Sequence, residues 1–153
     1  MKSVPSHLKF FENLMGLRRK SRELALQMLF QLDVNKDREL WRERFWKLHP
    51  APPEVKAFAD RLVDGVLDQQ PEIDRLIQKH ALHWTLNRMS IVDRNVLRYA
   101  IFELLFMAVI PTSVVINEAI EISKRYSDEQ AGAFVNGILD HILKEESVAQ
   151  RGT

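Results

Sequence analysis

The hydrophobic residues recur at helical spacing along most of the chain. In the clearest stretch, the apolar positions i, i+3, i+4 and i+7 are occupied by Ala25, Met28, Leu29 and Leu32. Polar side chains fill the positions between them, and this pattern predicts an amphipathic helix over about residues 19–34. Residues 1–17 have weak periodicity and contain Pro5 and Gly16, so we expect a loosely held extension or a short helix there.

Prolines and polar breaks divide the rest of the chain into further helices. A short helix is expected over about residues 38–48, before Pro50, Pro52 and Pro53. Pro71 is expected to end one helix and begin the next. The remaining helices are predicted over about residues 53–70, 71–82, 91–110, 112–126 and 128–142. With about seven helices and no convincing strand, the predicted fold class is all-α.

Candidate capping residues support several of these boundaries. Ser90 and Asp93 resemble a capping box, with Asp in place of the preferred Glu or Gln. The candidate caps of the next two helices are Thr112 or Ser113 and Ser127 or Asp128.

A few residues within the apolar runs indicate special packing. Asn117 and Asn136 look buried, and Gly137 in mid-helix costs about 1 kcal/mol relative to alanine. We interpret these three residues as a tight helix–helix crossing, and a polar patch for a protein or RNA partner is the alternative. Trp84 is expected to point inward, and Phe134 is expected in the core.

Composition excludes several classes of site. The chain contains no cysteine, which excludes disulfides, thiolate zinc sites, iron–sulfur clusters and a cysteine nucleophile. None of the five glycines falls in a dinucleotide-binding or P-loop pattern. The longest apolar stretch, residues 99–110, is too short to span a bilayer, and there is no signal peptide, so we expect a soluble, cytoplasmic protein.

Charge is distributed unevenly along the chain. Residues 1–22 hold six Lys or Arg and one acid, a net charge of +5, whereas the other 131 residues carry a net charge of −4. Four of the basic residues are Arg18, Arg19, Lys20 and Arg22, at the expected start of a helix, where they oppose the helix dipole. Their presence there indicates either a polyanion-binding surface or a solvated, frayed helix end, and composition leaves both readings open.

Catalytic and metal-ligating patterns are weak. His80 and His83 are three residues apart without an evident third ligand, so we expect no metal site. Glu118 and Glu121 share a helix face, as a general acid/base pair would. Because Lys124 and Arg125 are nearby, we interpret the two carboxylates as part of a salt-bridged surface. We therefore predict neither a catalytic residue nor a cofactor.

Four segments occur in the order and spacing of a known family. They are RRKSRELALQMLF at 18–30, VDRNVLRYAIFEL at 92–104, VINEAIE at 115–121 after Ile110-Pro111, and FVNGILD at 134–140. Over about residues 18–143 the chain resembles the bacterial transcription antitermination factor family NusB. The last two segments together are the specific part of this resemblance, whereas the basic segment alone is a weak signal.

The resemblance implies an all-helical fold of two small helical bundles and a non-enzymatic role in Nus-dependent antitermination and ribosomal RNA transcription. Members of the family pair with the small-subunit ribosomal protein NusE, and the heterodimer binds boxA-type single-stranded RNA. Other Nus factors and RNA polymerase would then be indirect partners. Whether the free protein is a monomer or a homodimer stays open.

The resemblance also assigns roles to particular positions. Asp93 falls at a position associated with the NusE interface, although capping its own helix is the competing role. Two departures from the family pattern, Gln130 and Ala131, adjoin the expected RNA contacts. The positions that the resemblance implies for RNA binding are Arg18, Arg19, Lys20, Arg22, Phe30, Tyr126 and Phe134.

The expected domain organisation follows from these features. It comprises an extension at 1–17, a NusB-like helical RNA-binding domain at 18–145 and a frayed tail at 146–153. Two other functions stay open: a helical adaptor that binds protein but not RNA, and a non-catalytic RNA-binding partner of a ribosomal RNA-modifying enzyme.

Overall fold

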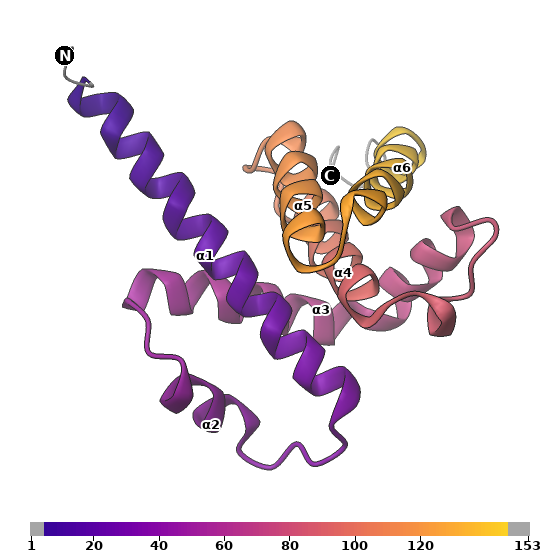
Figure 1. Ribbon diagram of the computed structural model, residues 1–153, viewed down its shortest axis with the longest axis horizontal. Helices are drawn as coiled ribbons and strands as arrows, with labels where there is room; N and C mark the ends of the chain where they lie inside the picture. Colours follow the sequence, from indigo (N-terminus) through magenta and orange to yellow (C-terminus); the bar gives the residue numbers. More distant parts are fainter. Residues whose placement is uncertain (1–4, 147–153) are drawn as a thin grey trace.

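A computed structural model of the protein describes residues 5–146, and it is built from helices (Figure 1). The elements in this range are α1 (Ser6–Val34), α2 (Trp41–Leu48), α3 (Pro53–His80), the 3-10 turn η1 (Leu86–Arg88), α4 (Ile91–Phe106), α5 (Thr112–Tyr126) and α6 (Glu129–Glu145). The all-α prediction is confirmed. Apart from Glu146, the tail expected at 146–153 lies outside the described residues.

Three of the predicted helix boundaries were wrong. α4 ends at Phe106 and not near residue 110. α1 begins at Ser6 and not near residue 19, because Pro5 directly precedes the helix and Gly16 is tolerated inside it. α3 continues through Pro71, whose ring is exposed, since the apolar stripe buries Val66 before it and Ile73 after it. The expected seven helices are therefore six α-helices and a 3-10 turn.

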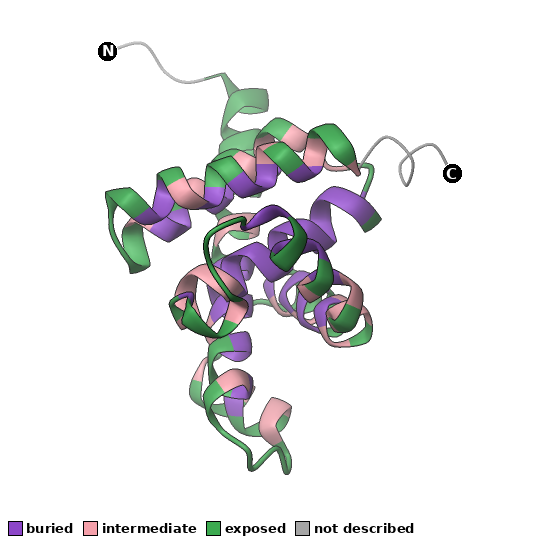
Figure 2. Ribbon diagram, turned by 90° about the vertical axis from the view of Figure 1, so that its right-hand side faces the viewer, coloured by how far each residue is buried: buried purple, intermediate pink, exposed green. Residues whose placement is uncertain are grey.

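α4 lies at the centre of the molecule and packs against α1, α3, α5 and α6 (Figure 1). It is buried on nearly every side, as its apolar sequence predicts. Figure 2 shows the buried residues gathered where these helices cross. The N-terminal bundle, with α1 and α3, and the C-terminal bundle of α4–α6 share a single hydrophobic core, which includes Leu105.

The first three turns of α1 project away from this core (Figures 1 and 2). Their large apolar side chains are exposed: Leu8, Phe10, Phe11 and Met15 have exposed fractions between 46% and 63%. The segment expected as a loosely held extension or a short helix is the first part of the long helix α1 from Ser6 onward, and it remains outside the core.

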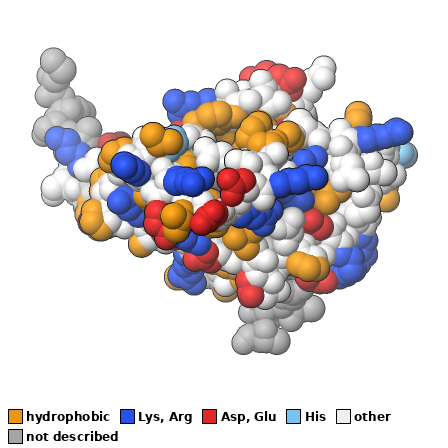
Figure 3. Space-filling view, turned by 90° about the horizontal axis from the view of Figure 1, so that it is seen from below, with side chains coloured by type: hydrophobic (Ala, Val, Ile, Leu, Met, Phe, Trp, Pro, Cys, Tyr) orange, Lys and Arg blue, Asp and Glu red, His pale blue; other side chains and the backbone are white. Residues whose placement is uncertain are grey.

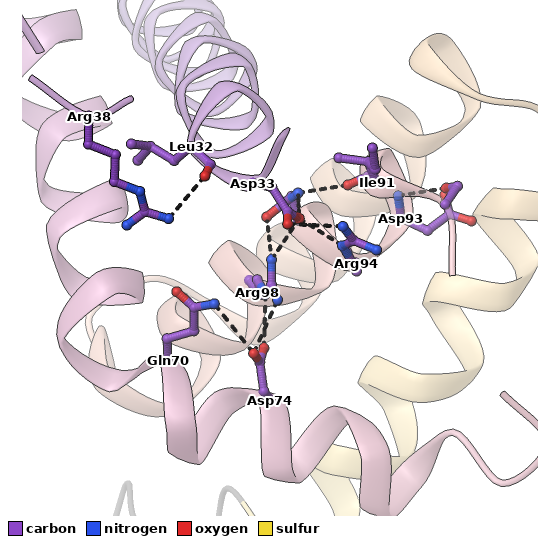
Figure 4. A network of polar contacts seen from close by, with 11 residues as sticks. Leu32, Asp33, Arg38, Gln70, Asp74, Ile91, Asp93, Arg94 and Arg98 are labelled. Carbon is purple, nitrogen blue, oxygen red and sulfur yellow. Dashed lines mark hydrogen bonds and ion pairs between the residues drawn. The ribbon is translucent and has the colours of Figure 1, made fainter. Parts of the chain in front are cut away.

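A polar network joins three helices at the other end of α1 (Figure 4). Asp33 accepts hydrogen bonds from Arg94 Nε at 2.7 Å and from Asn95 at 2.9 Å, and Arg98 bridges it to Asp74 on α3. Although burial alone would raise the pKa of Asp33, these partners lower it below the ordinary value. Polar residues of the VDRNVLR segment therefore hold α4 against α1 and α3.

The helix caps agree only partly with expectation. The Ser90 hydroxyl accepts from the backbone N–H of Asp93 at 3.0 Å, and Asp128 caps α6 through the N–H of Ala131 at 2.8 Å. The prediction for α5 was wrong, because that helix begins directly after Pro111 without a side-chain cap. In the described part of the chain, no helix is long and apolar enough to span a membrane.

Candidate nucleic-acid interface

The basic cluster, defined as Arg18, Arg19, Lys20 and Arg22, lies in the middle of α1. Because the helix begins at Ser6, the cluster is about three turns from the N-terminus. The expected conflict with the helix dipole is therefore wrong, since that effect falls off within the first turn. Successive side chains point about 100° apart, so the four basic residues face different neighbours.

Arg22 points into the protein and forms a buried ion pair. Its guanidinium donates to both carboxylate oxygens of Glu103 on α4, with the Nη2–Oε1 distance at 2.8 Å and the Nε–Oε2 distance at 3.0 Å. The two side chains are only 3% and 0% exposed. Burial raises the pKa of Glu103, and the hydrogen bonds from Arg22 oppose this rise. The implied RNA contact at Arg22 conflicts with this placement, because the guanidinium is occupied inside the fold.

The other three basic residues reach the surface in different ways. The Arg18 guanidinium lies 4.1 Å from the centre of the Phe58 ring, on the side of α1 that faces α3. Arg19 donates to Glu118 on α5 at 2.7 Å, and its side chain is 43% exposed. This hydrogen bond raises the pKa of Arg19. Lys20 is exposed and, among the described side chains, is in no ion pair.

Two partly exposed aromatic residues, Phe30 and Tyr126, lie on α1 and at the end of α5. Glu23 on α1 accepts from Tyr126 at 3.0 Å and from Arg125 at 2.9 Å, which ties the end of α5 to α1. Burial and Glu23 raise the pKa of the Tyr126 hydroxyl, so it stays a neutral donor. Phe30, seven residues after Glu23, shares this face of the helix. We name the group comprising Arg19, Lys20, Phe30, Arg125 and Tyr126 the α1–α5 surface.

The basic and aromatic members of this surface are accessible. Phe30 and Tyr126 are 37% and 38% exposed. On the face that carries α2, by contrast, Lys and Arg side chains alternate with Asp and Glu (Figure 3). The α1–α5 surface thus offers cations for phosphates and rings for unstacked bases, the combination that single-stranded nucleic acids require.

Phe134 lies in a separate hollow of about 340 Å³ between the start of α4 and the start of α6. Its ring packs edge-on against Trp84 at 6.4 Å. The expectation that Trp84 points inward was wrong: it is 51% exposed, and Phe134 is only half-buried. Ser127 and Asp128 line the hollow directly after Tyr126, so the hollow adjoins the α1–α5 surface.

Asp93 lines the same hollow with a carboxylate oxygen that has no partner. Its Oδ1 atom is buried without a hydrogen bond, although its backbone N–H is capped by Ser90. Burial raises the pKa of Asp93, and the hydrogen bond with Ser90 opposes the rise. A carboxylate in such a position favours a basic or hydrogen-bonding partner. Gln130 and Ala131, the two departures from the family pattern, line this hollow too.

Other residues singled out from the sequence have different roles. Asn117, Asn136 and Gly137 are all exposed, and a side chain at Gly137 would meet nothing within 4 Å, so the tight crossing expected there was wrong. Glu118 is buried against Arg19, whereas Glu121 lies near Lys124 on the surface.

Sequence reasoning missed Glu103 as a structural partner. One signal was available: Glu103 is the single acid in the apolar stretch 99–110, and a buried acid requires a basic partner. The histidine pair His80 and His83 was also misleading, because His83 is exposed in the following loop and His80 instead contacts His141 on α6.

Comparisons with known proteins agree with this architecture. The model of the NusB family matches residues 19–144. The transcription antitermination protein NusB of Desulfatibacillum aliphaticivorans is 45% identical over 142 residues, covering 90% of this chain and 99% of that protein. The one from Anaeromyxobacter dehalogenans is 47% identical over 137 residues, covering 88% of this chain and 96% of that protein.

Two solved structures are similar over nearly their whole length. T. maritima NusB is 42% identical, with a TM-score of 0.77, covering 88% of this chain and 96% of that one. A NusB in complex with NusE and double-stranded RNA is 32% identical, with a TM-score of 0.75, covering 85% of this chain and 98% of that one. The chain therefore belongs to the NusB family of transcription antitermination factors, which is a non-catalytic family.

Proposed function

We propose that this protein binds boxA-type single-stranded RNA through its α1–α5 surface, together with NusE, and so supports ribosomal RNA transcription in the cytoplasm. The observation that carries the proposal is the juxtaposition of exposed Lys20 and half-exposed Arg19 with the Phe30 and Tyr126 rings. Lysine and arginine cations bind phosphates, and aromatic rings stack on unpaired bases. Other Nus factors and RNA polymerase would be reached through the assembled complex.

We propose the hollow beside Asp93 as the surface for NusE. The support is the buried Oδ1 atom of Asp93, which has no hydrogen-bond partner, together with the exposed Trp84 ring that lines the same hollow. Aromatic residues around a partly desolvated charge are typical of energetically important interface residues. A family member has been solved in complex with NusE, which supports NusE as the partner.

The RNA proposal is tested by binding titrations with labelled RNA over a range of salt concentrations. Each phosphate contact to single-stranded RNA contributes about 0.7 to the slope of log K against log salt. Lys20→Ala should reduce the slope by about that amount, whereas Lys47→Ala, an exposed lysine on α2, should leave it unchanged. Phe30→Ala should weaken binding by about 1–3 kcal/mol with little change in slope.

The RNA itself provides the second comparison. Because the RNA in the related complex is double-stranded, boxA single strands should be compared with a duplex of the same sequence. Preference for the duplex, or an unchanged slope with Lys20→Ala, would contradict the proposed mode. Binding to NusE without any RNA binding would instead favour the protein-only adaptor. RNA binding by a protein that does not bind NusE at all would favour a partner of an RNA-modifying enzyme.

A further inference from the structure

Two histidine rings from different helices face each other far from the α1–α5 surface. His80 is the last residue of α3, and His141 lies near the end of α6. Their Nδ1 atoms are 3.0 Å apart, and the rings meet edge-on at 5.3 Å. The His80 side chain is only 2% exposed, whereas that of His141 is 54% exposed.

A carboxylate completes a group of three candidate ligands. Glu145 follows His141 by one helical turn, and its oxygens lie 3.7 Å from His141 Nδ1 and 3.9 Å from His80 Nδ1. All three candidate donor atoms lie within 4.8 Å of one another. Ligands bound at about 2.0–2.2 Å to one tetrahedral metal ion are separated by about 3.3–3.6 Å. Small rotations of the two exposed side chains would bring the set to that spacing.

The buried histidine is oriented for this role. Its Nε2 atom lies 3.2 Å from the Glu146 carboxylate, which in turn accepts from Lys79 at 2.6 Å. An imidazole that donates Nε2–H to a carboxylate leaves a lone pair on Nδ1, the arrangement that accompanies metal-binding histidines. That lone pair points at His141.

We propose that His80 Nδ1, His141 Nδ1 and the Glu145 carboxylate bind one Zn²⁺ ion, with a water molecule in the fourth position. Two imidazoles and one carboxylate suit zinc among the divalent metals, although Cu²⁺ and Ni²⁺ bind the same donors. The ion would join the C-terminal end of α3 to that of α6. The sequence prediction of no metal site considered His80 with His83, which the fold separates.

Calorimetric titration of the full chain, without an affinity tag, with Zn²⁺ tests the site. We expect one ion per chain and a Tm that rises with zinc concentration, by about 5–10 °C at a hundred times Kd. His141→Ala and Glu145→Gln change exposed side chains and should leave the apo fold intact, so a loss of affinity reports on the site. His141→Ala should weaken binding at least about a hundredfold. His83→Ala removes an exposed histidine near the site and should have no effect.

Two further measurements distinguish a specific zinc site from nonspecific zinc binding by surface histidines. Glu146→Gln should weaken Zn²⁺ affinity about 10–100-fold without removing a ligand, because it loosens the orientation of His80. The ring NMR signals of His80 and His141 should shift on zinc addition while those of His83 stay fixed. Equal losses with His83→Ala and His141→Ala, or a wild type that binds no tighter than His141→Ala, would overturn the proposal.

Discussion

Basic residues that are neighbours in the sequence lie in different environments in this protein. Arg22 is buried against Glu103, while Lys20, two positions earlier, is exposed. The helix turns about 200° between them, so one side chain faces the core and the other faces solvent. A run of basic residues in the sequence therefore contains both a residue buried in the fold and a residue exposed to solvent, and only the packing of α4 against α1 distinguishes them.

Arg22→Ala should destabilise the protein by about 3–5 kcal/mol, because it leaves Glu103 buried and unpaired. Lys20→Ala, on the same helix, should change the free energy of unfolding by no more than about 0.5 kcal/mol. Urea denaturation of both variants at neutral pH measures the difference. Equal midpoints would mean that the buried pair adds nothing to stability.

Asp93 has a pH signature that distinguishes a partner site from a helix cap. Burial raises its pKa above the ordinary 3.8, so its ionised form is disfavoured in the fold, and its contribution to stability is lost as the pH rises through the folded pKa. Asp93→Asn, which is neutral at all pH values, should therefore be at least as stable as the wild type at pH 7. That advantage should vanish at pH 3.

Denaturant unfolding at the two pH values tests this expectation. Asp128→Ala is the control for cap loss and should be less stable than the wild type by about 0.5–2 kcal/mol at pH 7, because Asp128 does cap its helix. If Asp93→Asn were clearly less stable than the wild type at pH 7, the carboxylate would be acting as a cap and the interface assignment would lose its basis.

At the scale of whole elements, helix lengths were the least predictable feature. Gly16 and Pro71 are ordinary helix breakers, yet α1 and α3 run through them. For α3 the reason is tertiary: its buried stripe continues on both sides of Pro71, and burial outweighs the cost of one lost backbone hydrogen bond. Local patterns located the apolar faces, but they do not contain the packing energy that extends a helix across a weak residue.

Two glycines give opposite predictions for the same substitution. Gly137→Ala should stabilise the protein by about 0.5–1 kcal/mol, because the new methyl group of α6 meets nothing within 4 Å and alanine favours the helix. Gly65→Ala should destabilise it by about 1–3 kcal/mol, since a Cβ atom on α3 would overlap the Phe102 ring. Thermal unfolding of both variants checks the pair. Destabilisation by Gly137→Ala would show that α6 packs differently there.

At the scale of the molecule, the site was less predictable than the fold. The all-α class follows from periodicity, and Arg19, Lys20, Phe30 and Tyr126 are all at least partly exposed, on α1 and at the end of α5. The position of Phe134 beside Trp84, in a hollow shared with Asp93, depends on how α4, α6 and the loop before η1 come together. Such contacts join residues far apart in the chain, and the spacing of residues within one helix does not predict them.

The α1–α5 surface and the hollow adjoin through residues 126–128, which makes their two partners thermodynamically coupled in our proposal. If NusE binding orders this junction, NusE should tighten RNA binding, and RNA should tighten NusE binding by the same factor, typically 5–150-fold.

Two variants test this coupling. Asp93→Asn should leave the RNA affinity of the free protein unchanged but reduce the gain in RNA affinity that a fixed concentration of NusE produces. Lys20→Ala should weaken RNA binding whether NusE is present or not. RNA titrations of the two variants at several NusE concentrations measure this coupling, and an Asp93→Asn protein that loses RNA affinity even without NusE would instead place that carboxylate in the RNA interface.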